Sequence, residues 1–167
     1  FVITTGDNIY GTFGFALRFN SSGDKDTHWE SRFFRPYAPI LTHIPFYPSL
    51  GNHDGNETEA RADLPAYLDN FFFPGNMPAR WYQFQAGGLV EFFALDSTWN
   101  TLENSMGPAY SPIGEQFTWM KQALPASKAP WKIAYFHHPP FSAGPRHEAL
   151  FKELKHWTGL FAEAGVP

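Results

Sequence analysis

Cysteine is absent from the 167 residues of this chain. A disulfide framework, a thiolate zinc site and a cysteine nucleophile are therefore excluded. An excess of positive charge is also lacking, because 12 Lys and Arg residues stand against 16 Asp and Glu residues, for a formal net charge of -4. No stretch approaches the roughly 18 consecutive apolar residues that a membrane span needs. We therefore expect neither a nucleic-acid partner nor a membrane partner.

The chain is instead rich in hydrophobic and aromatic residues. Its hydrophobic content is 43%, which at 167 residues suffices for one folded domain with its own core. The aromatic share is 19%, including 18 Phe. Much of it falls in long irregular segments, so we expect aromatic loops on the rim of a binding site. The residues concerned are Phe13, Phe15, Phe19, Trp99 and Tyr110.

Apolar patterns in the first half of the chain predict a strand, a helix and a second strand. Residues 1–5 and 46–50 have the character of short buried strands, and the apolar spacing over 27–43 indicates a helix bent at Pro36 and Pro39. A right-handed crossover between two parallel strands places the loops that follow them side by side. We therefore expect these two loops to share a ligand.

The second half adds antiparallel pairing and further helices. Apolar runs on both sides of Gly87-Gly88 indicate a hairpin. The predicted elements are a helix over 59–72, hairpin strands over 81–85 and 89–95, a helix with Pro112 in its first turn, a strand over 131–136 and a helix over 150–161. Parallel and antiparallel pairing combined with these helices predicts an α/β fold.

Three polar clusters each follow one of the predicted strands. They are Gly6-Asp7-Asn8-Ile9-Tyr10, Gly51-Asn52-His53-Asp54 and His137-His138-Pro139-Pro140. Loops at the carboxyl ends of strands in an α/β sheet are where ligands bind. The long segments 11–25 and 97–112 also begin close behind strand ends, and loops of that length are commonly functional. The sequence therefore predicts a binding site at this edge of the sheet.

The first two clusters contain side chains that bind metal ions. Asp7 stands on a tight turn, where its two carboxylate oxygens can bind two ions, and the Asn52 amide oxygen can bind one. His53 can reach a substrate oxygen, and Asp54 can fix the tautomer of that imidazole. Carboxylate, imidazole and amide ligands suit zinc, iron and manganese. Taken singly, Asp7 is more often a turn residue and Tyr10 a packed aromatic residue.

The third cluster contains adjacent histidines, His137 and His138, followed by two prolines that hold the imidazoles at the strand end. We expect one of the two to be a metal ligand, while the other can be a core histidine. His147 follows at a predicted helix start, where its imidazole and nearby backbone N–H groups can meet a phosphate. From the residues alone, a functional role for His147 and no role at all are about equally favoured.

Together and in this order, the blocks Gly6–Tyr10, Gly51–Asp54 and Ala134–His137 resemble three of the five motif blocks of the purple acid phosphatases. These enzymes belong to the calcineurin-like metallophosphoesterase superfamily. The Gly-Asn-His-Asp block is specific for the superfamily, whereas Tyr10 and the His-x-Pro form at His137 point to the purple acid branch. The resemblance implies a four-layer α/β/β/α sandwich, in which helices flank two mixed sheets.

The resemblance also implies a centre with two metal ions, iron paired with zinc, manganese or a second iron. By this resemblance Asp7 bridges the two ions and Tyr10 binds the ferric ion. Asn52 and His137 bind the divalent ion. His53 stabilises or protonates the leaving group, and the purple acid phosphatases place a substrate-facing histidine at about the position of His147.

The activity implied is the hydrolysis of phosphomonoesters, as in an acid phosphatase, by a hydroxide held between the two ions. A leaving-group histidine needs its proton, while a ferric ion keeps hydroxide available in acid, so the rate should peak below neutral pH. A rate that rises into the alkaline range would instead indicate a phosphodiesterase of the wider superfamily. A non-catalytic module that binds phosphoesters or glycans is a further alternative.

The substrate expected is a small phosphoester, and the aromatic loops suggest tolerance of an aryl leaving group. By resemblance alone, the protein is expected to be exported to the extracellular space, the periplasm or the lysosome. Two family blocks, an early aspartate ligand and a final Gly-His-x-His pair, have no counterpart in the sequence. We therefore expect residues 1–167 to be one catalytic domain, truncated at both ends and poorly active or inactive by itself.

Overall fold

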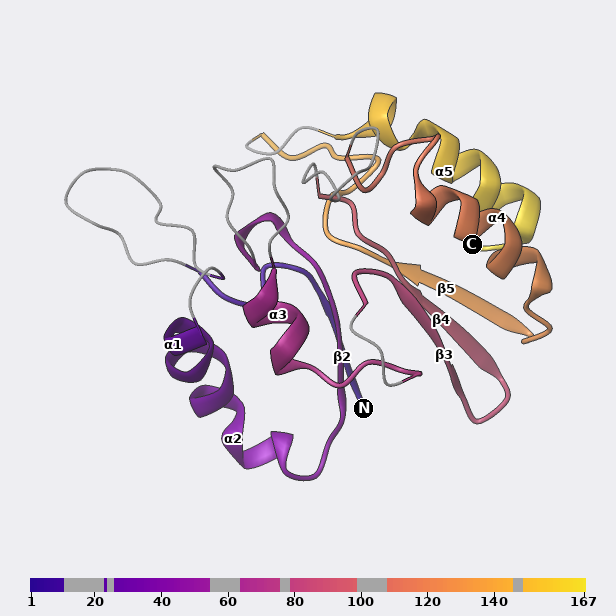
Figure 1. The fold of residues 1–167 in the computed structure, drawn as a ribbon. Coiled ribbons are helices and arrows are strands. Elements are labelled where there is room, and N and C mark those ends of the chain that lie inside the picture. The colour runs from indigo at the N-terminus through magenta and orange to yellow at the C-terminus, as the bar shows by residue number, and fades with distance from the viewer. Residues whose placement is uncertain (11–22, 24–25, 55–63, 76–78, 99–107, 146–148) are drawn as a thin grey trace.

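A computed structural model describes residues 1–10, 23, 26–54, 64–75, 79–98, 108–145 and 149–167 of the chain (Figure 1). The strands are β1 (Val2–Thr5), β2 (Phe46–Ser49), β3 (Tyr82–Ala86), β4 (Val90–Ala94) and β5 (Trp131–Tyr135). The helices are α1 (Asp26–Trp29), α2 (Arg35–Leu41), α3 (Pro65–Asn70), α4 (Glu115–Ala126) and α5 (Phe151–Ala164). A π-helical turn, η1 (Glu30–Phe34), joins α1 to α2, and a 3-10 turn, η2 (Asn52–Asp54), follows β2.

The described strands form two sheets. In one sheet β1 and β2 are parallel, with Val2 opposite Phe46, and in the other β4 lies between an antiparallel β3 and a parallel β5. The predicted parallel pair and the predicted hairpin are both present. The hairpin belongs to the second sheet, so the antiparallel pairing does not extend the β1–β2 sheet.

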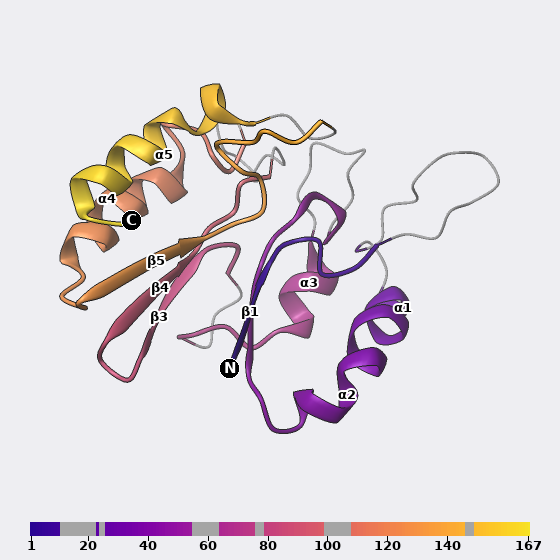
Figure 2. The same cartoon turned by 180° about the vertical axis from the view of Figure 1, so that it is seen from behind.

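The two sheets and the helices are stacked in four layers (Figures 1 and 2). The sheets face one another through Tyr47 and Phe84, whose rings stack with centroids 3.8 Å apart. On the opposite face of β2, Phe46 packs against Phe33 of η1, and α1, α2 and α3 lie on that side. Neighbouring residues of a strand point to opposite faces, which explains this division. The predicted four-layer α/β/β/α sandwich is confirmed.

Strand β4 separates two hydrophobic clusters by the same alternation. Phe92 belongs to a cluster that joins the two sheets and the helices on the first one, whereas Phe93 belongs to a second cluster with Met120 of α4 and Trp157 of α5. Each of these side chains is at least nine-tenths buried. The burial of aromatic and aliphatic surface on the Phe93 face of the second sheet is therefore what holds α4 and α5 on it.

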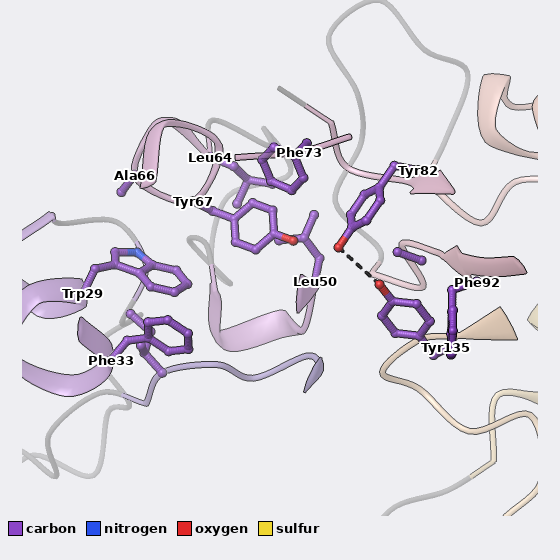
Figure 3. Close-up of a cluster of buried hydrophobic side chains, with 12 residues drawn as sticks. Trp29, Phe33, Leu50, Leu64, Ala66, Tyr67, Phe73, Tyr82, Phe92 and Tyr135 are labelled. Atoms are coloured by element: carbon purple, nitrogen blue, oxygen red, sulfur yellow. Dashed lines mark hydrogen bonds between the residues drawn. The ribbon is translucent and has the colours of Figure 1, made fainter. Parts of the chain in front are cut away.

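Most described aromatic residues belong to these cores rather than to loops. Figure 3 shows Trp29, Phe33, Tyr67 and Tyr82 among the side chains packed between the layers. The described aromatic side chains mainly fill the space between the layers, while the expected aromatic rim falls largely on loops outside the described residues and stays a prediction. Of the five proposed rim residues only Tyr110 lies in the described residues, where it is partly buried.

The helix expected over 27–43 is present as the continuous run α1, η1 and α2, with Pro36 in the first turn of α2 and Pro39 inside it. The helix expected to begin with Pro112 in its first turn begins later, at Glu115. The Gly114 N–H donates to the Ser111 carbonyl at 3.0 Å, which closes a separate turn around Pro112 before the helix. No helix in the described ranges has the length and apolar character that crossing a membrane requires.

Candidate metal centre

The loops after β1, β2 and β5 meet at one edge of the two sheets. The meeting depends on two glycines, because a Cβ atom on Gly51 would lie 2.1 Å from the Asp7 nitrogen and one on Gly6 would lie 2.7 Å from the His137 Cβ. Gly6 has φ +83, which favours glycine, and Asp7 itself has φ 50. Chain segments far apart in sequence thus approach closely enough for their polar side chains to touch.

His137 stands between the other predicted metal ligands. Its Nε2 atom lies 3.0 Å from Oδ1 of Asn52 and 3.3 Å from Oδ2 of Asp7. Its Nδ1 atom lies 2.9 Å from the Thr5 carbonyl oxygen. A carbonyl oxygen only accepts, so Nδ1 carries a proton and donates it to Thr5. This bond fixes the orientation of the ring and directs Nε2 at Asn52 and Asp7.

The donor set at this point fits a metal ion. In a neutral His137 with its proton on Nδ1, the Nε2 atom has only a lone pair, yet it faces two oxygen atoms that are themselves acceptors. A proton on Nε2 or a metal ion among the three atoms would satisfy all of them. One imidazole nitrogen, one amide oxygen and one carboxylate oxygen are ligands that zinc, iron and manganese accept.

The charges of Asp7 and His137 favour each other. Burial by itself would raise the pKa of Asp7, but the hydrogen bonds from His137 and from the His53 N–H, 3.0 Å away, lower it on balance. Burial would lower the pKa of His137, but the Asp7 carboxylate raises it on balance. The paired carboxylate of Asp7 therefore stays ionised and can bind a cation.

The described residues contain no cluster of three or more His, Asp or Glu side chains around one point.

Tyr10 lies at the open side of this group, and its side chain is 55% exposed. Its ring is 4.8 Å from the ring of His53, measured between centroids. Burial and the neighbouring Asp7 carboxylate raise the pKa of Tyr10 to about 12, so its hydroxyl keeps its proton unless a cation displaces it. Arg32 of η1 donates to the Tyr10 carbonyl oxygen at 2.6 Å and thereby ties this loop to the helical layer.

Asp54 is fully buried beneath the loops rather than turned to the surface. Its carboxylate accepts from the Asn8 amide at 2.8 Å, from the Gly51 N–H at 2.8 Å and from the Ile9 N–H at 3.3 Å. Burial raises the pKa of Asp54 to about 7 against these donors, which lower it. Asp54 thus binds the loop after β1 to the loop after β2. Asn8 lies inside the first polar cluster but was not among the predicted site residues.

The structure separates the two adjacent histidines. His138 contacts Ser97 instead: its Nδ1 atom lies 3.0 Å from the Ser97 hydroxyl, and its backbone N–H donates to the same hydroxyl at 2.9 Å. Burial lowers the pKa of His138 to about 4, so it is neutral over the ordinary pH range. His147, the predicted phosphate contact, lies outside the described residues. Of the two adjacent histidines, His137 is therefore the one whose ring lies beside Asp7 and Asn52.

Comparison with known proteins places this geometry in context. The family model described as calcineurin-like phosphoesterase matches residues 1–158. Purple acid phosphatase 17 of Arabidopsis thaliana is 28% identical over 170 aligned positions, which cover 92% of this chain and 46% of that protein. In a solved structure, GAP50, described as the anchor in the inner membrane complex of Plasmodium, matches 99% of this chain and 53% of its own with a TM-score of 0.56 and 17% identity. The chain thus spans about half the length of these relatives.

Proposed function

Because the chain belongs to the calcineurin-like phosphoesterases, we propose that it forms part of a catalytic domain that hydrolyses phosphoesters with metal ions. The observation that carries this proposal is the convergence of Asp7, Asn52 and His137 on one point. These side chains come from three different loops, and packing alone does not call for three such donors at one place. They are the residues that would hold a metal ion here.

A bound metal ion would polarise a phosphoryl oxygen and make hydroxide available at ordinary pH. The residues of the chain have separate tasks around it. Thr5 holds His137 in the tautomer that presents Nε2, and His53, whose backbone N–H binds Asp7, is placed beside Tyr10. We assign to His53 the transfer of a proton to the leaving oxygen, with Asp54 positioning the loop that carries it.

The likeness to purple acid phosphatase 17 supports the finer assignment to a phosphomonoesterase with two metal ions, iron among them. In that assignment Asp7 would be a ligand shared by the ions and Tyr10 would be a ligand of the ferric one. The substrate is then a small phosphoester, and His147 contacts its phosphate. Export from the cytoplasm, without a nucleic-acid or membrane partner, belongs to the same proposal.

Metal content is the first test of this function. The chain is stripped of metal, reconstituted with zinc, manganese or iron and measured by elemental analysis, beside His137→Ala and, as a matched control, His138→Ala. We expect the chain and His138→Ala to retain about one ion and His137→Ala to lose it, because only His137 faces Asp7 and Asn52. Folded protein without metal in all three would overturn the metal site and favour the non-catalytic binding module.

Because residues 1–167 alone are expected to be poorly active, hydrolysis is tested in a longer chain that adds the two missing family blocks, with an aryl phosphomonoester and an aryl phosphodiester at saturating metal. We expect preference for the monoester, a bell-shaped pH profile with its maximum below neutrality, and loss of the rate in His53→Ala with phosphate binding retained. A rate that rises into the alkaline range would assign the protein to the phosphodiesterases instead. Retained turnover in His53→Ala would remove the proposed proton donor.

A further inference from the structure

Two of the converging ligands come from different sheets. Asn52 follows β2 in the first sheet, and His137 follows β5 in the second. In the described residues, no strand pairing joins β2 to β5. Side-chain contacts between the faces of the two sheets therefore help to set the distance between Asn52 and His137, beside the bond from His137 to the Thr5 carbonyl.

Buried tyrosine hydroxyls make polar contacts across this gap (Figure 3). Tyr82 of β3 donates to the Pro48 carbonyl oxygen of β2 at 2.6 Å. The hydroxyl of Tyr135 lies 3.2 Å from the Tyr82 hydroxyl and 3.2 Å from the Tyr47 carbonyl oxygen. Both strands of the second sheet that carry these tyrosines are therefore hydrogen-bonded to the backbone of β2.

These bonds lie close to the ligands along the chain. Pro48 lies shortly before Asn52 in the chain, and only Phe136 separates Tyr135 from His137. Tyr82 and Tyr135 are each 5% exposed. A hydrogen bond in such buried surroundings is costly to leave unmade.

From this arrangement we propose that Tyr82 and Tyr135 are positioning residues, which set the spacing of β2 and β5 and thereby hold Asn52 and His137 at metal-binding distance. The inference rests on the proposed function, because it assumes that this pair binds a metal. Neither tyrosine is a ligand. Each acts through the backbone of the strand that its hydroxyl binds, as outer partners of metal ligands do.

Tyr67 provides a matched control. Its hydroxyl donates to the same Pro48 carbonyl oxygen at 3.2 Å, and its side chain is completely buried. Tyr67 belongs to α3, however, on the helical side of the first sheet, and so it does not connect the two sheets. Tyr67→Phe and Tyr82→Phe each remove one buried hydroxyl bound to one carbonyl, but only Tyr82→Phe removes a bond between the sheets.

The test is Zn²⁺ binding by calorimetry to the metal-free chain and to Tyr82→Phe, Tyr135→Phe and Tyr67→Phe. Denaturant unfolding without metal establishes that each variant is folded and how much stability it has lost. We expect both inter-sheet variants to bind Zn²⁺ at least about tenfold more weakly than the chain. Tyr67→Phe should keep its affinity within about twofold at a similar loss of stability.

The outcomes separate the two proposals. Wild-type affinity in folded Tyr82→Phe and Tyr135→Phe would overturn the positioning role while leaving the metal site intact. An equal loss of affinity in Tyr67→Phe would also overturn it, since the effect would then follow stability rather than sheet spacing. A folded chain that binds no Zn²⁺ would overturn the proposed metal site and this inference with it. Either inter-sheet variant suffices if the other fails to fold.

Discussion

Gly51 lies against the backbone of Asp7 so closely that no side chain fits between the two loops. A Cβ atom at position 51 would approach the Asp7 nitrogen and also its Oδ1 atom, at 2.3 Å. The contact is with backbone, which cannot rotate away as a flexible side chain can. The close approach of these loops is therefore a property of single residues, and it places Asp7 beside the segment that carries Asn52.

We expect Gly51→Ala to lower the free energy of unfolding by about 2–3 kcal/mol, because the added methyl forces the loops apart. Gly159→Ala is the control, since position 159 lies in α5 and a Cβ there would meet nothing within 4 Å. That substitution should raise the free energy of unfolding by about 0.5–1 kcal/mol through helix propensity. Denaturant titration measures both, and a neutral Gly51→Ala would refute the close contact.

His156 makes the stability of the fold depend on pH. Its ring packs edge-on against Phe117, with centroids 4.6 Å apart, and burial lowers its pKa below 6.5. At a pH just below 6.5, His156 therefore binds a proton more readily in the unfolded chain than in the folded chain. Stability should therefore be complete above about pH 6.5 and decrease as the pH falls through that value.

Replacing His156 with Gln removes this proton uptake. We expect the free energy of unfolding of His156→Gln to fall less than that of the chain between about pH 7.5 and pH 5.5. The difference between the two proteins at about pH 8, where the histidine is neutral in both states, measures the packing lost by the substitution. Parallel pH curves for the two proteins would show that His156 does not titrate differently on folding.

At the scale of elements, the end of β4 is joined to its surroundings by a buried polar network. Arg80 forms an ion pair with Asp96, whose other oxygen accepts from Thr98. Gln116 of α4 accepts from the Asp96 N–H at 2.7 Å and donates to the Asp96 carbonyl at 2.9 Å. The network ties the segment before β3 and helix α4 to the chain that leaves β4 toward Ser97.

We expect Arg80→Met to cost about 3–5 kcal/mol of unfolding free energy, because it leaves the carboxylate of Asp96 buried without its partner. The pair of Arg35 and Glu30 is the control, since its side chains are 73% and 62% exposed and water screens their charges. Arg35→Met should cost less than about 1 kcal/mol. Equal losses in the two variants, measured by denaturant unfolding, would contradict the burial of the Arg80 pair.

At the scale of the whole molecule, the two hydrophobic clusters share one sheet. Phe92 and Phe93 are neighbours on β4, yet they lie in different clusters on opposite faces. Neither cluster can lose its packing without exposing a face of the same strand. We infer that the described elements unfold together rather than layer by layer.

Phe92→Ala and Phe93→Ala test this coupling. Each should cost about 3–5 kcal/mol, and each should move a single transition seen equally by circular dichroism and tryptophan fluorescence. Phe72→Ala is the control, because Phe72 is 96% exposed and its removal should change the free energy of unfolding by less than about 0.5 kcal/mol. Two separate transitions in either core variant would show that the layers unfold independently.

Much of the element order follows from local sequence patterns. The apolar runs before Asp7, Asn52 and His137 predicted β1, β2 and β5, because a strand's character depends on residues that adjoin in the chain. The right-handed crossover rule then brought the first two loops together, as the structure confirms. The roles of the site residues and the extent of the domain stay predictions.

The sequence by itself therefore determined which side chains end the strands, and with them the family resemblance and the candidate ligands. Tertiary structure alone decided that His137 rather than His138 faces Asp7, and that tyrosine hydroxyls connect the two sheets. Local patterns act over a few residues, whereas Tyr135 and Tyr47 are 88 positions apart. Such contacts arise only when whole layers pack, because packing determines which buried hydroxyl meets which carbonyl.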